Sequence, residues 1–317
     1  MYIHSIYSAF TESTQPVEVY KKMSSPDFSD IFEKNEMRRL SPLIKNGVGC
    51  GIKAYKDSNF TYLNGIITGT GKGSISKIEQ FLRDIDTYHE SALNPGIFIQ
   101  STHNTINGQL GLKLGYNTYN MTHVNQGFTF NNVLMDAQLI LSEKKEGQVL
   151  AGFFEENTEF NVDIHQRSGL SGNLKNGEYE IIWGEGVSFF TLSNQTEGSL
   201  SKINDFKSFT NLNGSDHWRS LNEYCKSKYF QSDTLFLLGS NNEKELSSHY
   251  GEILELLNNN NLQFRTFKNR CGEFDTSSSY ALKVAVEVLS KNEGYSKVII
   301  CNHFKDYVNQ FVEISLP

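Results

Sequence analysis

The sequence predicts an α/β protein whose sheets are buried and predominantly parallel. Three observations support this prediction. Apolar runs of strand length, such as residues 234–238, alternate with longer segments of helical periodicity. This alternation occurs in both halves of the chain, so each half has a βαβ rhythm consistent with a duplicated architecture. At 317 residues, of which 38% are hydrophobic, the chain is also long enough to bury a large core.

Composition excludes several classes of protein. The net charge of −7 argues against a nucleic-acid-binding surface, and no apolar run has the length of a membrane span. The first residues lack the basic and apolar regions of a signal peptide, so we expect a cytoplasmic protein. The four cysteines lie far apart without a CxxC pair, which predicts reduced thiols rather than disulfides or a zinc site. Neither a metal nor a cofactor is expected.

In the first part of the chain, residues 37–55 have apolar side chains at spacings of three and four, which predicts an amphipathic helix. Residues 62–68 have the pattern of a strand. The glycine-rich turn at 69–73 follows this strand but lacks the Walker spacing, so a plain turn into a helix at 76–87 is favoured over a phosphate site.

Residues 98–141 contain the arrangement around which the chain is organised. An apolar lead-in and a polar helix are followed by an extended run at 116–124, a sharp bend, and a second apolar-periodic helix at 128–141. Strand, tight bend and helix is how many α/β enzymes present a nucleophile. The predicted apex is Val124, whose side chain cannot attack an electrophile. The sequence thus predicts the frame of a nucleophilic site without the nucleophile.

The remaining segments complete both halves. Strands are predicted at 148–154, 181–192, 234–238 and 298–301, and helices at 218–226, 245–257 and 277–289. Polar, glycine-bearing residues at 155–178 predict a surface excursion, and the Ser-, Asn- and Gly-rich stretch 193–215 is the candidate boundary between the halves.

Four separated segments resemble the β-ketoacyl synthase family of the thiolase superfamily. Residues 37–51 (MRRLSPLIKNGVGCG) look like its early helix, residues 104–108 (NTING) like its Asn-x-x-x-Gly helix, residues 184–187 (GEGV) like its Gly-Glu-Gly-Ala turn, and residues 268–289 like its late Lys-to-helix segment. Residues 98–108 look closest to the ketosynthase-like proteins of bacterial aryl polyene, flexirubin and dialkylresorcinol clusters. The resemblance implies a five-layer αβαβα fold with two pseudo-duplicated halves, residues 1–200 and a shortened 201–317, which together form one compact unit.

The chain departs from the family at each catalytic position. Val124 stands where active members carry the acyl-accepting Cys. Gly239 and Ser240 occupy the place of the first catalytic His, and Glu273 that of the second. The family's final Gly-Phe-Gly-Gly turn looks replaced by residues 303–307. Because the two histidines normally stabilise the oxyanion and drive malonyl decarboxylation, these losses are hard to reconcile with Claisen condensation.

A synthase-like chain without its nucleophile resembles a chain length factor. The resemblance implies a non-catalytic subunit that pairs with an active ketosynthase, receives chains from an acyl carrier protein and helps to shape an acyl tunnel. It implies a dimer strand at Asn117, Thr118, Tyr119, Asn120 and Met121, and residues near the partner's tunnel at Ser101, Thr102, His103, Asn104 and Asn107. Phe128 is either part of the ordinary core, the favoured interpretation, or a wall of the acyl tunnel. The exposed Arg38–Arg39 pair could steer an acidic carrier protein, although a solvated helix face explains it equally well.

Other residues leave alternatives open. Cys301 and His303 share one face of a predicted strand, so an acyl transferase or thioesterase with relocated Cys–His chemistry is one alternative, and a homodimeric acyl-binding scaffold is another. His123 is expected to point away from Val124 because strand residues alternate faces. Cys271 lies near Glu273, which would suppress its thiolate. Glu185 is interpreted as a structural acceptor of backbone N–H groups.

Overall fold

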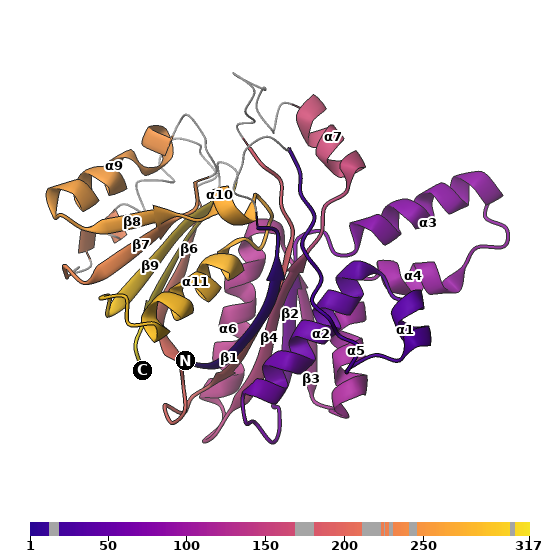
Figure 1. The fold of residues 1–317 in the computed structure, drawn as a ribbon, viewed down its shortest axis with the longest axis horizontal. Coiled ribbons are helices and arrows are strands. Elements are labelled where there is room, and N and C mark those ends of the chain that lie inside the picture. Colours follow the sequence, from indigo (N-terminus) through magenta and orange to yellow (C-terminus); the bar gives the residue numbers. More distant parts are fainter. Residues whose placement is uncertain are drawn as a thin grey trace.

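The computed structural model describes residues 1–12, 19–168, 181–210, 223–224, 226–227, 231–240, 246–304 and 308–317 (Figure 1). The strands are β1 (Tyr2–Phe10), β2 (Gly65–Thr70), β3 (Tyr119–Val124), β4 (Gln148–Glu155), β5 (Gly186–Ser193), β6 (Ser201–Thr210), β7 (Thr234–Leu238), β8 (Gln263–Thr266), β9 (Lys297–Phe304) and β10 (Val308–Ser315). The helices are α1 (Lys34–Arg39), α2 (Pro42–Asp57), α3 (Ile75–Tyr88), α4 (Pro95–Ser101), α5 (Thr105–Leu114), α6 (Thr129–Ser142), α7 (Glu159–Arg167), α9 (Leu246–Asn259), α10 (Lys268–Cys271) and α11 (Ser278–Ser290).

The strands form one sheet of two equivalent sets. Its order is β3-β2-β4-β5-β1-β6-β10-β9-β7-β8. The first five strands and the last five therefore follow the same order when each is read from its outer edge, and the two sets meet where β1 pairs with β6 over two residue pairs. This repetition is the duplicated α/β architecture expected from the sequence.

The sheet is mixed, so the prediction of predominantly parallel strands was wrong. In each half three strands are parallel: β3, β2 and β4 in the first, and β8, β7 and β9 in the second. β5 and β10 then run antiparallel to both of their neighbours. These strands are as thoroughly buried as parallel ones, and their buried apolar runs do not reveal strand direction.

Three hydrophobic clusters define the layers. One contains α2 and α5 against the outer face of the first half-sheet, and another contains α9 against the outer face of the second. The largest cluster holds residues of α6 and α11 together with strands of both halves. The layers are thus α2/α5, half-sheet, α6/α11, half-sheet and α9, with α6 and α11 between the half-sheets as expected for a five-layer fold (Figure 1).

The predicted helix at 37–55 is divided into α1 and α2. Leu40 is extended, and Ser41 caps α2 by accepting a hydrogen bond from the Ile44 N–H at 3.3 Å. Pro42 occupies the first turn of α2 and restricts the residue before it to extended conformations, so one continuous helix is excluded. The glycines on α2 do permit close packing: a Cβ at Gly47 would lie 2.6 Å from the Ile106 side chain.

The candidate boundary at 193–215 contains β6, the first strand of the second set, which begins at Ser201. This strand is ten residues long and pairs with β10 along its length. Its polar sequence reflects its exposure on one side rather than a linker. The excursion at 155–178 contains α7, with its remaining part beyond residue 168 outside the described residues, as is most of the helix predicted at 218–226. No helix within the described residues is both long and apolar enough to cross a bilayer.

Candidate functional site

The strand–turn–helix at the end of β3 is the frame predicted from the sequence. β3 ends at Val124, and a tight turn follows in which Gln126 adopts a left-handed φ of 45° before α6 begins. The turn therefore lies one to two residues after Val124, the predicted apex. The Thr129 hydroxyl accepts a hydrogen bond from the Asn125 N–H at 2.8 Å and lies 3.3 Å from the Thr70 carbonyl oxygen, which connects the turn to β2.

Val124 lies on an exposed edge of the sheet. Its side chain is 46% exposed, and β3 is the first strand in the sheet order, so among the described residues only β2 pairs with it. His123 points to the opposite face of β3, where its Nε2 lies 2.8 Å from Asp136 on α6. The expectation that His123 faces away from Val124 is confirmed, and no general base is presented at this position by His123.

A residue of the second half packs against the buried side of this turn. A Cβ on Gly127 would lie 2.4 Å from the side chain of Phe304, the last residue of β9. Phe304 belongs to the segment 303–307, which was predicted to replace a glycine-rich turn, and it is only 7% exposed. The space behind the turn is thus filled by an aromatic ring. Residues 305–307 of the same segment lie outside the described residues.

The residues predicted from the resemblance to stand in place of two catalytic histidines make structural contacts. The Gly239 N–H donates to the Cys301 carbonyl at 2.8 Å, and a Cβ at Gly239 would meet the Asn302 Oδ1 at 2.0 Å. Ser240 is buried, and the residues that follow it lie outside the described residues. At Gly239 the structure therefore has a close backbone approach between β7 and β9.

Glu273 forms a largely buried ion pair. Its carboxylate lies 2.7 Å from the Nζ of Lys268, which is fully buried and also donates to the His303 carbonyl at 2.8 Å. A negative charge held here by a lysine cannot act as the imidazole donor that an enolate oxyanion requires. The Glu273 backbone also joins the turn at 182–184, because its N–H donates to the Ile182 carbonyl at 2.7 Å.

Cys301 and Cys271, the two cysteines considered as nucleophiles, are both fully buried. Cys301 and His303 share a face of β9, as predicted, but Cys301 is fully buried and His303 is 4% exposed. The His303 Nδ1 lies 3.0 Å from the Tyr250 hydroxyl. Burial, with a smaller contribution from Glu273, raises the pKa of the Cys271 thiol. A thiol that cannot reach substrate or ionise readily is a poor nucleophile, so the geometry does not favour relocated Cys–His chemistry.

Glu185 has the structural role that its sequence predicts. It accepts hydrogen bonds from the Met23 and Asn157 N–H groups at 2.8 and 3.2 Å and from the Tyr20 hydroxyl at 3.0 Å. Burial raises the pKa of this carboxyl, and the hydrogen bonds oppose that rise. These contacts fix the turn before β5 to the chain on either side of it.

Glu155 accepts hydrogen bonds from the glycine-rich turn at 69–73, a role that was not predicted from the sequence. Glu155 is fully buried at the end of β4 and accepts the N–H groups of Gly71 and Lys72 at 2.7 and 2.8 Å. These amides would be the ones to hold a phosphate, and the carboxyl group of Glu155 already occupies them. The plain-turn interpretation therefore fits the structure. A buried acid after an apolar strand is the signal that could have indicated such a partner.

The residues expected near a partner lie along one side of the first half. Asn107 is fully buried, and its Nδ2 donates to the carbonyls of Ile66 and Met121 at 3.2 and 2.7 Å, so it bridges β2 and β3. Ser101 ends α4, and Thr102, His103 and Asn104 connect it to α5. Asn117 and Thr118 precede β3, which contains Tyr119, Asn120 and Met121, and the half-buried Phe128 stands before α6.

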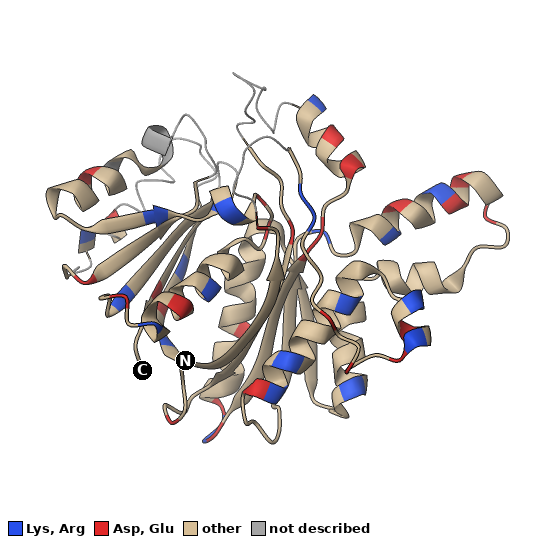
Figure 2. Ribbon diagram, in the orientation of Figure 1, with Lys and Arg blue, Asp and Glu red and all other residues tan. Residues whose placement is uncertain are grey.

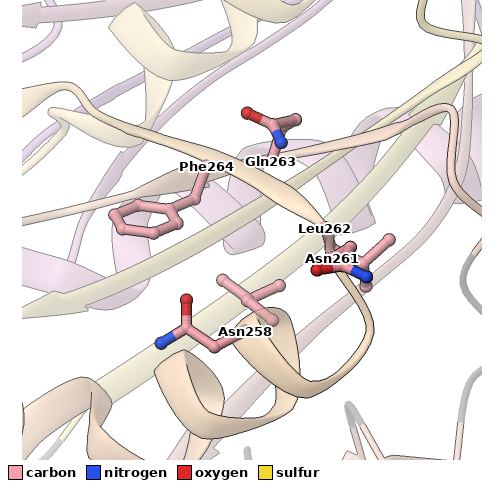
Figure 3. Close-up of a pocket in the computed structure, with 6 residues that line it drawn as sticks. Asn258, Asn261, Leu262, Gln263 and Phe264 are labelled. Carbon is pink, nitrogen blue, oxygen red and sulfur yellow. The ribbon is translucent and has the colours of Figure 1, made fainter.

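Two cavities lie away from this frame. One, of about 250 Å³, is a shallow depression between the end of α9 and β8, lined by Asn258, Asn261, Leu262, Gln263 and Phe264 (Figure 3). The other, of about 390 Å³, includes His4 and Ser193, whose Nε2 and Oγ are 2.7 Å apart. Ser193 is 1% exposed and its hydroxyl accepts the Gln195 N–H, so this pair does not present a nucleophile. Within the described residues, no group of three metal-binding side chains converges.

Comparisons with known proteins support the fold. No family model matches the chain, and no curated protein matches it in sequence. Among solved structures, a chain of the complex of a type II polyketide synthase (PKS) acyl-carrier protein with its ketosynthase, AntDE:AntF, superimposes with a TM-score of 0.80 at 14% identity, covering 100% of this chain and 99% of that one.

Two further structures are similar. The ishigamide ketosynthase/chain length factor has a TM-score of 0.75 at 10% identity, covering 99% of each chain. A β-ketoacyl synthase from Burkholderia phymatum has a TM-score of 0.77 at 9% identity, covering 100% of this chain and 99% of that chain. The chain therefore has the thiolase-like fold of ketosynthases, over its whole length.

Proposed function

We propose that the protein is a non-catalytic, ketosynthase-like subunit of the chain length factor type, which pairs with an active ketosynthase in type II polyketide or fatty-acid-like synthesis. The observation that carries the proposal is that β3, the strand leading to the predicted nucleophile position, ends in Val124 yet forms an exposed edge that no other described strand pairs with. The frame for presenting a thiol is intact, whereas the residues needed for chemistry are replaced at all three positions.

The outer face of β3 has the properties of a docking surface. Tyr119 and Met121 are 43% and 40% exposed, and Met135 and Leu139 on the neighbouring α6 are more exposed still. An edge strand with a free row of backbone groups invites pairing with another chain, and apolar side chains beside it add buried surface. Pairing of this edge with the corresponding edge of a ketosynthase would bury both.

The α3–α4 segment supports the same partner. Neither helix has a buried residue, and both extend away from the sheets (Figure 1). Leu82, Phe98 and Ile99 are each more than half exposed. Such an arm gains little stability from its own chain, so a second subunit that covers these side chains would account for their apolar character.

Delivery by an acyl carrier protein is supported by charge near this surface. Figure 2 shows Lys and Arg on α1 and along α2. Within the described part of the chain, neither Arg38 nor Arg39 forms an ion pair, whereas Lys53 and Lys113 are paired with Asp30 and Glu36 at 2.6 and 2.7 Å. Unpaired cations at a helix end can attract an acidic carrier. The resemblance of residues 98–108 further supports an aryl polyene type of product.

Co-expression tests the proposal. We expect the chain to co-purify with an intact ketosynthase as a 1:1 heterodimer by light scattering. Met121→Asp should abolish the complex, because it places a charge on the docking strand. Leu200→Asp is the matched control, since Leu200 is 39% exposed and precedes β6, in the middle of the sheet order. A stable homodimer, or an unpaired monomer beside every ketosynthase tested, would refute the heterodimer.

A further inference from the structure

A buried chain of hydrogen bonds links the second half of the protein to the turn after β3. Asn302 on β9 donates through its Nδ2 to the Ser278 hydroxyl at 2.7 Å. Ser278, at the start of α11, donates to the Gln310 Oε1 at 2.5 Å. Gln310 on β10 donates through its Nε2 to the Gly127 carbonyl at 2.6 Å. Three elements of the second half thus act together on one peptide group of the first.

The direction of this chain is fixed by its last acceptor. A backbone carbonyl can only accept, so the Gln310 amide must present its NH₂ group to Gly127. Its oxygen then faces Ser278, whose hydroxyl must donate to it and can accept from Asn302. No alternative orientation satisfies the same contacts, and the chain therefore specifies one arrangement of side chains.

Water cannot replace these contacts. The side chains of Ser278, Asn302 and Gln310 belong to residues that are 1–2% exposed, and Gly127 is buried beneath Phe304. Removing one donor would leave a buried acceptor unpaired, which costs much more than the loss of an exposed hydrogen bond. Gly127 is therefore held on two sides, by the Phe304 ring at its Cα and by Gln310 at its carbonyl oxygen.

We propose that Gln310 is a positioning residue for β3, which it holds in the geometry needed to dock on a partner subunit. In the part of the chain that the structure describes, β3 pairs with β2 alone, and its last residue is three positions from Gly127. Anchoring the turn consequently fixes the end of the exposed strand. The part that concerns docking rests on the function proposed above, whereas the anchoring of the turn does not.

Amide hydrogen exchange tests the anchoring in the isolated protein. In Gln310→Leu and in Ser278→Ala, the amides of residues 125–128 should exchange about tenfold faster or more relative to the core strands. Ser5→Ala is the matched control, because the buried Ser5 hydroxyl donates to the Ala54 carbonyl at 2.5 Å, away from the turn. It should lower global stability without a selective effect on residues 125–128. Exchange within twofold of wild type in Ser278→Ala would overturn the proposal, even if Gln310→Leu fails to fold.

A Gln310→Glu variant distinguishes hydrogen-bond donation by this side chain from a role in packing alone. A neutral carboxyl can donate to Gly127, whereas an ionised one cannot, so protection of the turn should be near wild type at low pH and lost as pH rises. The wild-type turn should show no such dependence. If the amide protection of residues 125–128 in Gln310→Glu does not change with pH, the donor role of Gln310 is contradicted.

Binding then tests the consequence for docking. Gln310→Leu and Ser278→Ala should bind an active ketosynthase about tenfold more weakly than the wild type and the Ser5→Ala control. Faster exchange with unchanged affinity would overturn the coupling to docking. If the wild type binds no ketosynthase, the proposed function fails, and the exchange data alone decide whether Gln310 positions the turn.

Discussion

Glu155 should make the protein less stable as pH rises from 5 to 8. The residue is fully buried, and burial followed by the charge of Asp275 raises the pKa of its carboxyl to about 8. Lys72 and the hydrogen bonds from the Gly71 and Lys72 amides oppose the rise. Asp275 packs against Gly71 from the second half, since a Cβ on Gly71 would meet its Oδ2 at 1.9 Å. The two carboxyls therefore converge on one peptide at the junction of the halves.

The size and sign of the effect follow from proton linkage. The pKa of Glu155 is raised in the folded state above its ordinary value of 4.5, so the folded protein retains a proton that the unfolded chain releases. The stability contribution is complete below pH 4.5 and is lost as pH rises toward 8. One such group lowers the free energy of unfolding by about 1.4 kcal/mol per pH unit across that range, on the order of 5 kcal/mol in total. The raised pKa values of the buried Glu156 and Glu185 act in the same direction.

Denaturant unfolding at pH 5, 6, 7 and 8 measures this slope. Glu155→Gln should flatten it by about 1 kcal/mol per pH unit, whatever its effect on absolute stability, because the amide does not titrate. Glu143→Gln, at an exposed position after α6, should leave the slope unchanged. A wild-type protein whose stability increases from pH 5 to 8, or a Glu155→Gln variant with the wild-type slope, would refute the reasoning.

Three further predictions concern the site and the core. Val124→Cys should supply a thiol but no decarboxylation or condensation activity, measured as CO₂ release from a malonyl carrier. The reason is that position 273 holds a carboxylate paired with Lys268 and no imidazole. Turnover by this variant would show that a thiol at position 124 was all that the chain lacked. Lys268→Met should destabilise the protein by about 3–5 kcal/mol in chemical denaturation, and the Lys268→Met/Glu273→Met double variant should recover much of that loss, since an unpaired buried charge is the main cost. Phe130→Ala, at a fully buried ring 4.9 Å from that of Phe153, should cost about 3–5 kcal/mol, and a loss below 1 kcal/mol would contradict its place in the core.

The strand, turn and helix around Val124 could be predicted because local signals agree there. An extended run leads into a turn with Gly127, and α6 follows with apolar residues at helical spacing. The edge position of β3 was expected from the family resemblance. That Tyr119 and Met121 on this strand are exposed could be seen only in the structure. The fold class was predictable for the same reason, since both halves alternate strands with helices.

Two strands of the second half carry no comparable signal. β8 is four residues long and mostly exposed, so it has no buried apolar run. β10 includes the buried Asn309 and Gln310, and the Gln310 side chain reaches Ser278 and Gly127 on other elements. Burial of a polar residue by a partner far away in sequence cannot be recognised from local patterning. The same limit applies to Lys268, which a local reading places on the surface.

The residues at the predicted catalytic positions could be identified from the sequence, but the packing around them could not. Gly239 permits a close approach to Asn302, and Phe304 fills the space behind Gly127. Both contacts join segments that are distant in the chain. The sequence could therefore predict Val124 at the nucleophile position, whereas only the packing shows that Phe304 fills the space behind the turn.

Intact-protein mass spectrometry after exposure to an acylated carrier protein tests the central claim most directly. The purified chain should carry no acyl adduct, and in a mixture with its ketosynthase partner the adduct should form on the partner alone, with condensation only when both chains are present. A stable acyl adduct on this chain, or condensation by the isolated polypeptide, would contradict a subunit that supports the reaction without performing it.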